Sequence, residues 1–187
     1  MEIIPLEIPD ILLIQPVVYG DERGFFKETF RKELLLEHDI TVDFVQDNYS
    51  RSKKGTLRGL HYQLERGQDK LVLVGRGRVL DVAVDVRVGS PTFGKSVSVE
   101  LSDKNHQMLF IPKGFAHGFC VMSDEADFLY KCSEYYHPES ERGVYWNDPD
   151  LQIEWPELNS DYILSPKDEH HPFLKDMEHN DLPVWKP

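Results

Sequence analysis

Apolar and polar residues alternate with a period of two through the middle of the chain. The stretch 79–87 places four aliphatic side chains on one face and mostly polar groups on the other, and 97–101 repeats this pattern. Gly, Pro, Ser and Asp cluster between such stretches, as expected of turns. Further short strands are predicted at 42–48, 70–74, 107–111, 117–122 and 127–135. The pattern predicts a mainly β protein.

Helical spacing is clear in only one segment, Phe30–His38, for which Thr29 is the predicted N-cap. A second short helix is predicted to begin near Ser165, with Pro166 at its first position and Asp168 in its first turn. Many short strands without interleaved helices favour a sandwich or barrel over an α/β fold. We therefore predict a β jelly roll with short peripheral helices.

The 187 residues show no repeats or linkers, so a single domain spanning 1–187 is expected. No apolar run approaches the roughly 18 residues that cross a bilayer, so no membrane association is predicted. Acidic residues rather than basic ones precede the apolar run 11–14, unlike a signal peptide. Cys120 and Cys132 have no partners at zinc spacing and suit buried thiols in a reducing compartment. A cytoplasmic location is expected.

Charge is distributed unevenly along this acidic chain. The net charge of -12 argues against a nucleic-acid partner, which would need a basic surface. Between Arg51 and Arg78, however, eight Lys or Arg residues stand against two acidic residues. This segment is either a solvated basic edge or an anion-binding site.

Three polar segments stand out among the predicted strands, at 58–63, 111–118 and 129–136. The second segment contains the motif Pro-x-Gly-x-x-His, which ends at His117. This motif resembles the second conserved motif of cupins, whose His normally binds a metal. The first cupin motif would place its ligands at His61 and Gln63, but an amide is a poor ligand for a transition metal. Lys70 lies where a carboxylate ligand is usual, and its ammonium repels a cation. We predict no metal and no other cofactor, which leaves His61 available as a base.

Seven short motifs then occur in a specific order. They are Asp21–Phe26, Phe44–Asn48, Leu57–His61, Asp81–Asp85, Gly89–Gly94, Gly114–Phe119 and Leu164–Asp168. Together they resemble the successive signatures of the dTDP-4-dehydrorhamnose 3,5-epimerase family, from about residue 2 to 170. The resemblance implies a cupin jelly roll, a homodimer and a dTDP-linked 4-keto-6-deoxy sugar as substrate, within dTDP-L-rhamnose biosynthesis.

The resemblance also implies catalytic roles for four residues. Inverting carbons beside a ketone requires a base on one face of the sugar, an acid on the other and a group that stabilises the enolate. His61 matches the base, and Asp168 matches the carboxylate that orients it. Tyr130 matches the proton donor, and Lys70 matches the cation facing the C4 oxygen. Taken singly, each has an ordinary structural explanation, such as a strand aromatic for Tyr130.

Substrate-binding residues follow by the same resemblance. The matching positions are Arg23, Glu28, Gln46, Asp47, Asn48, Arg58, Lys70, His117, Tyr136, Glu141 and Lys167. Arg23, Arg58 and Lys167 suit the diphosphate, because guanidinium and ammonium groups donate to phosphate oxygens. Tyr136 matches the aromatic that stacks on thymine. In this family the second subunit completes the nucleotide site, so Arg23 and Glu28 are expected to serve the partner's pocket.

Several alternatives stay open at this point. The chain could invert only one carbon, act as a 3,4-ketoisomerase, bind sugars without catalysis or be a metal-dependent cupin oxygenase. Asp69 places a negative charge beside Lys70, although strand alternation predicts that it points the other way. The tail from His170 matches no motif, and 171–187 is expected to be a mobile or partner-facing extension.

Overall fold

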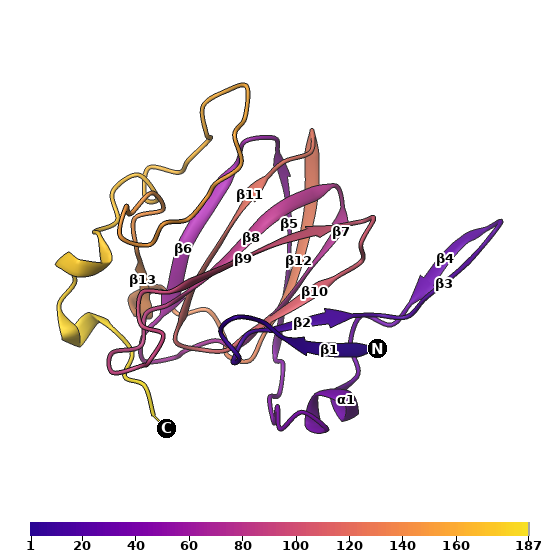
Figure 1. Cartoon of the computed structure of the whole chain (residues 1–187), viewed down its shortest axis with the longest axis horizontal. Coiled ribbons are helices and arrows are strands. Elements are labelled where there is room, and N and C mark those ends of the chain that lie inside the picture. The colour runs from indigo at the N-terminus through magenta and orange to yellow at the C-terminus, as the bar shows by residue number, and fades with distance from the viewer. Residues whose placement is uncertain (187) are drawn as a thin grey trace.

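Two antiparallel sheets lie face to face in the computed structural model, which describes residues 1–186 (Figure 1). The first sheet has the order β1 (Glu2–Pro5), β2 (Leu12–Gln15), β10 (Met108–Ile111), β7 (Lys70–Arg76), β12 (Glu125–Cys132) and β5 (Gln46–Lys53). The second has the order β13 (Glu141–Gly143), β6 (Leu57–Gln63), β11 (Phe115–Val121), β8 (Arg78–Asp85) and β9 (Ser96–Ser102). The predicted β jelly roll is confirmed.

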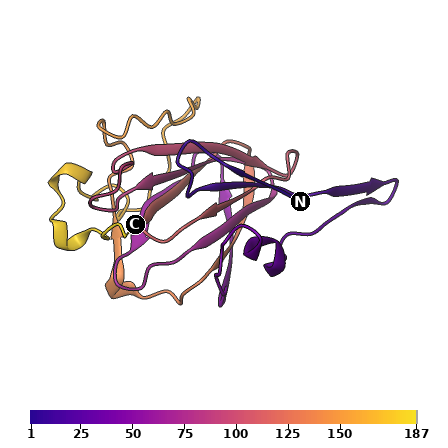
Figure 2. The same cartoon turned by 60° about the horizontal axis from the view of Figure 1, so that its bottom comes forward.

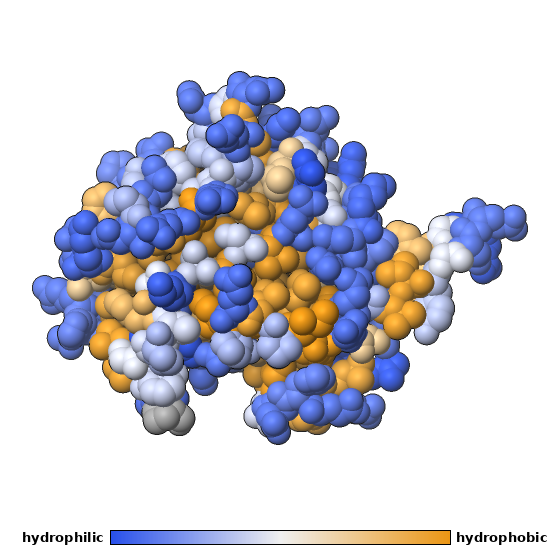
Figure 3. Space-filling model, in the orientation of Figure 1, coloured by the Kyte–Doolittle hydropathy of each residue, from blue (hydrophilic) through white to orange (hydrophobic). Residues whose placement is uncertain are grey.

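A separate hairpin, formed by β3 (Val18–Asp21) and β4 (Gly24–Lys27), projects away from both sheets (Figure 2). Its base is apolar and its tip polar on the face in view (Figure 3). The aromatic side chains of Tyr19, Phe25 and Phe26 are 64%, 60% and 67% exposed. An isolated two-stranded hairpin is only marginally stable in water. Within the described chain, Phe25 contacts His106, with ring centroids 4.7 Å apart, while Tyr19 and Phe26 pack against each other and stay largely exposed.

The predicted strands correspond to β5 and β7 to β12, with shifted ends. The largest shift is in β5, which begins at Gln46 rather than at Val42. Sequence analysis missed β1 to β4, β6 and β13. All but β6 are only three or four residues long, too short for alternation to be visible. In β6, Arg58 and Gly59 interrupt the apolar pattern.

Both helix predictions need correction. The helix α1 covers only Lys32–Leu36, and Arg31 rather than Thr29 is its N-cap, without a side-chain cap bond. Phe30 instead packs edge-on against Phe44, with ring centroids 5.5 Å apart. The segment after Ser165 forms a single turn and no helix. The other helical elements are short 3-10 turns, η1 (Pro138–Ser140), η2 (Leu174–Asp176) and η3 (His179–Asp181), and no helix of the described residues is long and apolar enough to cross a membrane.

The apolar face of β8 lies outside the sandwich. Val82 and Val84 pack in a buried cluster with Leu174 and Leu182 of the C-terminal segment, which covers the outer face of the second sheet. The opposite face of β8 points between the sheets, and there the fully buried Asp81 lies among otherwise apolar residues. The interior of the jelly roll is therefore partly polar.

The C-terminal segment is docked, which differs from the predicted mobile extension. Leu174 and Leu182 are buried, and the Tyr62 hydroxyl donates to the Asp181 carbonyl at 2.7 Å. Val184 forms a parallel bridge with Val88. The few apolar residues of the C-terminal segment cover the outer face of β8, which would otherwise be exposed to water. Residue 187 of the predicted tail lies outside the described residues.

An irregularity between β6 and β11 directs two polar side chains inward. His61 is opposite His117, and Arg58 is opposite Phe119, so three steps on β6 match two on β11. This bulge lets Arg58 and His61 both face the interior, although their spacing would place them on opposite faces of a regular strand. Gly59, at φ +119°, allows the close approach, because a Cβ there would lie 2.5 Å from the Gly118 Cα.

We expect Gly59→Ala to lower the free energy of unfolding by at least about 2 kcal/mol, because it adds a backbone clash to an unfavourable φ. Thermal and denaturant unfolding measure the change. Gly89→Ala is the matched control, since Gly89 has φ +85° but no atoms within 4 Å of its added Cβ. Equal destabilisation of the two variants would show that φ alone matters and that the approach of β11 does not.

Candidate active site

A cavity of about 410 Å³ opens between the two sheets. It is lined by residues of β6, β7, β11 and β12 and by the segment 163–168. Six of the predicted site residues line it: Arg58, His61, Lys70, His117, Tyr130 and Asp168. All four residues predicted to be catalytic therefore meet in one cavity, although they are distant in sequence.

His61 and Asp168 form a hydrogen-bonded pair, with Nε2 of His61 2.5 Å from Oδ1 of Asp168. The Asp168 side chain is 3% exposed and that of His61 is 27% exposed, so the imidazole reaches the cavity and the carboxylate lies behind it. Ser165 Oγ donates to the second carboxylate oxygen at 2.8 Å. Burial raises the pKa of Asp168, but the bonds from His61 and Ser165 outweigh it and hold this pKa below its ordinary value. The carboxylate thus stays ionised and orients the imidazole.

Tyr130 and Lys70 reach the cavity from the opposite sheet. Tyr130 lies on β12 and Lys70 begins β7, whereas His61 lies on β6 of the second sheet. Burial raises the pKa of the Tyr130 phenol, which therefore keeps its proton at neutral pH. Burial also lowers the pKa of the Lys70 ammonium, because the charged form loses hydration. A planar ligand between the sheets would meet a base on one side and an acid and a cation on the other.

His117 is buried and held by a carboxylate. Its Nε2 lies 3.1 and 3.0 Å from the two oxygens of Asp81 on the neighbouring strand β8. Burial lowers the pKa of His117, and the nearby Lys70 acts in the same direction, while Asp81 opposes both. The imidazole is therefore predominantly neutral near pH 7 and donates its Nε2 proton to Asp81.

These contacts do not fit the metal site usual in cupins. His117 Nε2 is bonded to Asp81, and the Gln63 amide donates to the Arg66 carbonyl at 2.8 Å and accepts from the His137 backbone. Lys70 lines the same cavity. Residues at the usual cupin ligand positions thus already hydrogen-bond to protein groups, and an ammonium group lies in the same cavity.

A second polar group lies outside the cavity lining. The Tyr136 hydroxyl donates to Oε2 of Glu141 at 2.6 Å, and Lys167 forms an ion pair with the same carboxylate. Gln46 Oε1 accepts from the Tyr136 backbone at 3.1 Å. Although burial raises the pKa of Glu141, its bonds with Lys167 and Tyr136 lower it overall. Four of the predicted binding residues thus form one network beside the catalytic residues.

The remaining predicted binding residues are less close to the cavity. Asn48 donates to the sulfur of Cys132, and Asp47 pairs with Lys131 at 2.9 Å, both from β5. Arg23 lies in the exposed turn of the hairpin, where it pairs with Asp21. Glu28 follows the hairpin and pairs with Arg31 at 2.8 Å. Within one chain, the structure therefore does not bring Arg23 and Glu28 to the cavity.

Only part of the basic segment contributes to the site. Arg58 and Lys70 line the cavity, whereas Arg51, Arg76 and Arg78 pair with acidic residues on neighbouring strands. Asp69 points away as alternation predicts, and its carboxylate accepts from Ser133 at 2.8 Å and from the Lys113 backbone.

Sequence reasoning missed three polar residues that lie next to the predicted site residues. Asp81 could have been identified as a carboxylate inside an apolar strand, and Ser165 by its three-residue spacing from Asp168. The third, His171, lies beside Asp168, and it has the same three-residue spacing from Asp168 on the other side.

Known proteins are similar to this chain in both sequence and fold. The family model for dTDP-4-dehydrorhamnose 3,5-epimerase matches residues 5–176. The Escherichia coli K12 enzyme of that name is 56% identical over 172 residues, covering 90% of this chain and 92% of the relative. The structure of the epimerase RmlC from Legionella pneumophila, in complex with dTDP-4-keto-L-rhamnose, is 52% identical, with a TM-score of 0.96 and coverage of 100% and 99%. ChmJ, a 3'-monoepimerase from Streptomyces bikiniensis in complex with dTDP-quinovose, is 37% identical, with a TM-score of 0.90 and coverage of 96% and 92%.

The fold and the cavity define a cupin-type jelly roll with paired acid and base groups between its sheets. The fold is shared with an epimerase that was solved in complex with dTDP-4-keto-L-rhamnose. The chain belongs to the dTDP-4-dehydrorhamnose 3,5-epimerase family.

We expect the imidazole of His117 to titrate below the ordinary value of about 6.5, because burial disfavours its charged form. Asp81→Asn should lower this pKa further, since it removes the carboxylate that favours the charged form. Side-chain NMR of labelled histidines across the acidic range measures both values. Titration of His117 at or above its ordinary pKa would contradict this electrostatic account.

Proposed function

We propose that this chain epimerises C3 and C5 of dTDP-4-dehydro-6-deoxy-D-glucose, giving dTDP-4-dehydro-L-rhamnose for dTDP-L-rhamnose biosynthesis. The observation that carries the proposal is one cavity into which the His61–Asp168 pair and Tyr130 project from facing sheets. Inversion at carbon needs proton removal on one face and proton delivery on the other.

His61 is the proposed base. Its Nε2 donates to Asp168, which fixes the tautomer and leaves the lone pair on Nδ1 to accept the proton from C3 or C5. The ionised carboxylate stabilises the imidazolium that forms, as in other imidazole–carboxylate pairs. Removal of the proton moves the C–H electron pair into the ketone and produces an enolate with its charge on the C4 oxygen.

Lys70 and Tyr130 complete the inversion. The Lys70 ammonium, which lines the cavity, is proposed to stabilise the enolate oxygen, because a charge interaction is stronger inside a desolvated cavity than in water. Tyr130 donates its phenolic proton to the opposite face of the carbanion, and the electron pair of the enolate forms the new C–H bond. The Tyr130 phenolate and the His61 imidazolium then exchange protons with solvent, which restores both groups before the second carbon reacts.

The polar network beside the cavity suits the nucleotide. Arg58 and Lys167 offer donors to the diphosphate, and the half-exposed ring of Tyr136 offers a surface on which thymine can stack. Glu141 holds Tyr136 and Lys167 together. His117, Gln46, Asp47 and Asn48 are proposed to contact the sugar and nucleoside, as implied by the family resemblance.

A homodimer is part of the proposal. The exposed aromatic side chains of the β3–β4 hairpin need a partner surface, and the hairpin carries Arg23 at its tip. An arm of this shape can extend over a second copy of the chain and deliver Arg23 and Glu28 to the partner's nucleotide site. Such an exchange would supply the two predicted binding residues that lie away from the cavity within one chain.

A cytoplasmic location is also proposed. Both cysteines are free and buried, which suits a reducing compartment.

Inversion of a single carbon is the nearest alternative, since a 3'-monoepimerase shares the fold at 37% identity. The double epimerases from Escherichia coli and Legionella pneumophila are more similar, at 56% and 52% identity. Pocket shape decides how many carbons reach His61, so the choice between the two functions needs a direct experiment.

Incubation with the 4-keto-6-deoxy substrate in deuterated water makes that choice. We expect deuterium at both C3 and C5, because each inversion replaces a carbon-bound proton with one from solvent, and mass spectrometry and NMR locate the label. A separate 4-keto reductase should convert the product to dTDP-L-rhamnose. Label at one carbon only would indicate a monoepimerase.

Variants of the two proton-transfer residues test their roles. His61→Ala should lower exchange at both carbons by about 10²–10⁴-fold, because no base remains to start the reaction. Tyr130→Phe should slow product formation by a similar factor while exchange on the His61 side persists. Phe128→Leu, which changes a cavity wall without removing a proton carrier, is the control. Full turnover by Tyr130→Phe would exclude Tyr130 as the acid.

The arm is tested by measuring mass in solution. We expect the unmodified chain to sediment as a dimer and the double variant Phe25→Ser/Phe26→Ser to dissociate, because it removes the apolar contacts of the hairpin. The dissociated variant should also bind dTDP more weakly, since Arg23 no longer reaches a partner. Val184→Ser is the control, because Val184 is also 67% exposed but lies on the C-terminal segment. A monomeric unmodified chain would refute the arm exchange.

A further inference from the structure

His171 is a half-buried histidine with a buried Nε2 atom, and the proposed reaction does not use it. Its side chain is 11% exposed, and its Nε2 has no hydrogen-bond partner among the described residues. That nitrogen lies 3.9 Å from Oδ1 of Asp168, the same oxygen that His61 contacts. A buried polar atom without a partner is costly, so its direction toward the catalytic pair requires an explanation.

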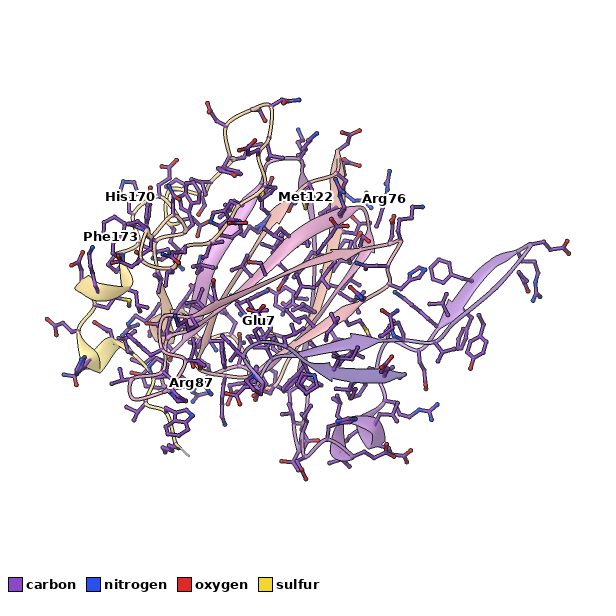
Figure 4. The ribbon with its side chains drawn as sticks, viewed as in Figure 1. Glu7, Arg76, Arg87, Met122, His170 and Phe173 are labelled. Carbon is purple, nitrogen blue, oxygen red and sulfur yellow. The ribbon has the colours of Figure 1, made fainter. Side chains whose placement is uncertain are left out.

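The chain places this ring with little freedom. His171 meets His61 edge-to-face, with ring centroids 5.5 Å apart. A Cβ on Gly143 would lie 2.4 Å from Nε2 of His171, so only glycine leaves room for the imidazole. The neighbours His170 and Phe173 lie on the C-terminal segment that covers the end of the second sheet (Figure 4).

We infer that His61, Asp168 and His171 form a binding site for Zn²⁺, and that the ion reversibly inhibits the enzyme. One ligand atom from each residue lies within 4.8 Å of the others. Tetrahedral zinc with bonds of about 2.0–2.1 Å holds its ligand atoms roughly 3.3 Å apart. The observed distances from Asp168 Oδ1, 2.5 Å to His61 and 3.9 Å to His171, lie on either side of that value.

The donor set selects a transition metal. Two imidazoles and one carboxylate suit Zn²⁺ far better than Mg²⁺ or Ca²⁺, which prefer oxygen ligands. Ser165 Oγ holds the other oxygen of Asp168 and so supplies the outer hydrogen bond that metal sites commonly have. Lys167, the cation that acts on His171, is paired with Glu141, and Lys70 reaches the cavity from the opposite sheet. The partly exposed His61 leaves the fourth position open toward the cavity for water.

The bond to zinc would disable the base directly. In the catalytic tautomer the proton is on Nε2 and the lone pair is on Nδ1. Zinc takes the Nε2 lone pair, so the neutral ring must carry its proton on Nδ1, and Asp168 turns from proton acceptor to metal ligand. No lone pair then remains to accept a proton from the sugar. This site differs from the usual cupin site, since it uses neither Gln63 nor His117.

Calorimetric titration of the chelator-treated, full-length protein with ZnCl₂ tests the site. We expect one Zn²⁺ per chain, and His171→Phe should weaken binding at least about tenfold, because the ring remains but the nitrogens are lost. His171→Leu is a second variant in case phenylalanine crowds Gly143. His179→Leu, which removes an exposed histidine of η3, should bind as the unmodified chain does. Equal affinity in all four proteins would overturn the inference.

Zinc binding can be tested without the proposed epimerase function, whereas zinc inhibition rests on that function. Two further measurements therefore test the two parts separately. In the unmodified protein, Zn²⁺ should shift the NMR signals of both His61 and His171, whatever the activity. If epimerisation is observed, Zn²⁺ should abolish it and a chelator should restore it, whereas His171→Phe should keep its zinc-free turnover and lose the sensitivity to zinc. Inhibition of His171→Phe at the same zinc concentration, or unshifted histidine signals, would reject the site.

Discussion

The hydrogen bond between His61 and Asp168 joins residues 107 positions apart, and the arrangement of the active site depends on it. The segment before Asp168 returns to β6 through a parallel bridge between Ile163 and Thr56, and Leu57 donates to the Ile163 carbonyl at 3.0 Å. These backbone bonds place the carboxylate behind the imidazole before any substrate binds. In the proposed mechanism, a base held in this way loses little orientation entropy on reaction, so the proposed catalysis depends on the late return of the chain to the sheet.

Alternation in the sequence revealed β5 and β7 to β12, but not which face of the second sheet points inward. In β8 the uniformly apolar face is covered by the C-terminal segment, while the face with Asp81 points between the sheets. A period of two distinguishes two faces, yet it cannot show that both are buried. The docked tail escaped prediction for the same reason, because its few apolar residues become meaningful only beside an outer face that needs cover.

The active site was predictable where a family motif marks it and not where geometry alone creates it. His61 and Asp168 lie within matching motifs, Lys70 and Tyr130 occupy positions that match the family outside those motifs, and the fold brings all four to one cavity. The bulge that turns Arg58 inward depends on the register of β6 against β11, which no local pattern encodes. His171 is three residues from Asp168, but its ring can lie there because Gly143, on another strand, leaves space for it.

The burial that shifts the pKa values of Lys70 and Tyr130 has one chemical consequence for both. In the free cavity an ammonium without full hydration is poorly stabilised, and a phenol holds its proton strongly. In the proposed reaction, formation of an enolate supplies a negative charge beside the Lys70 ammonium, and it presents Tyr130 with a carbanion basic enough to take its proton. Both interactions strengthen only as the reaction proceeds, so the desolvated interior favours the transition state over the bound ketone. A cavity open to water would stabilise both states equally and lose that difference.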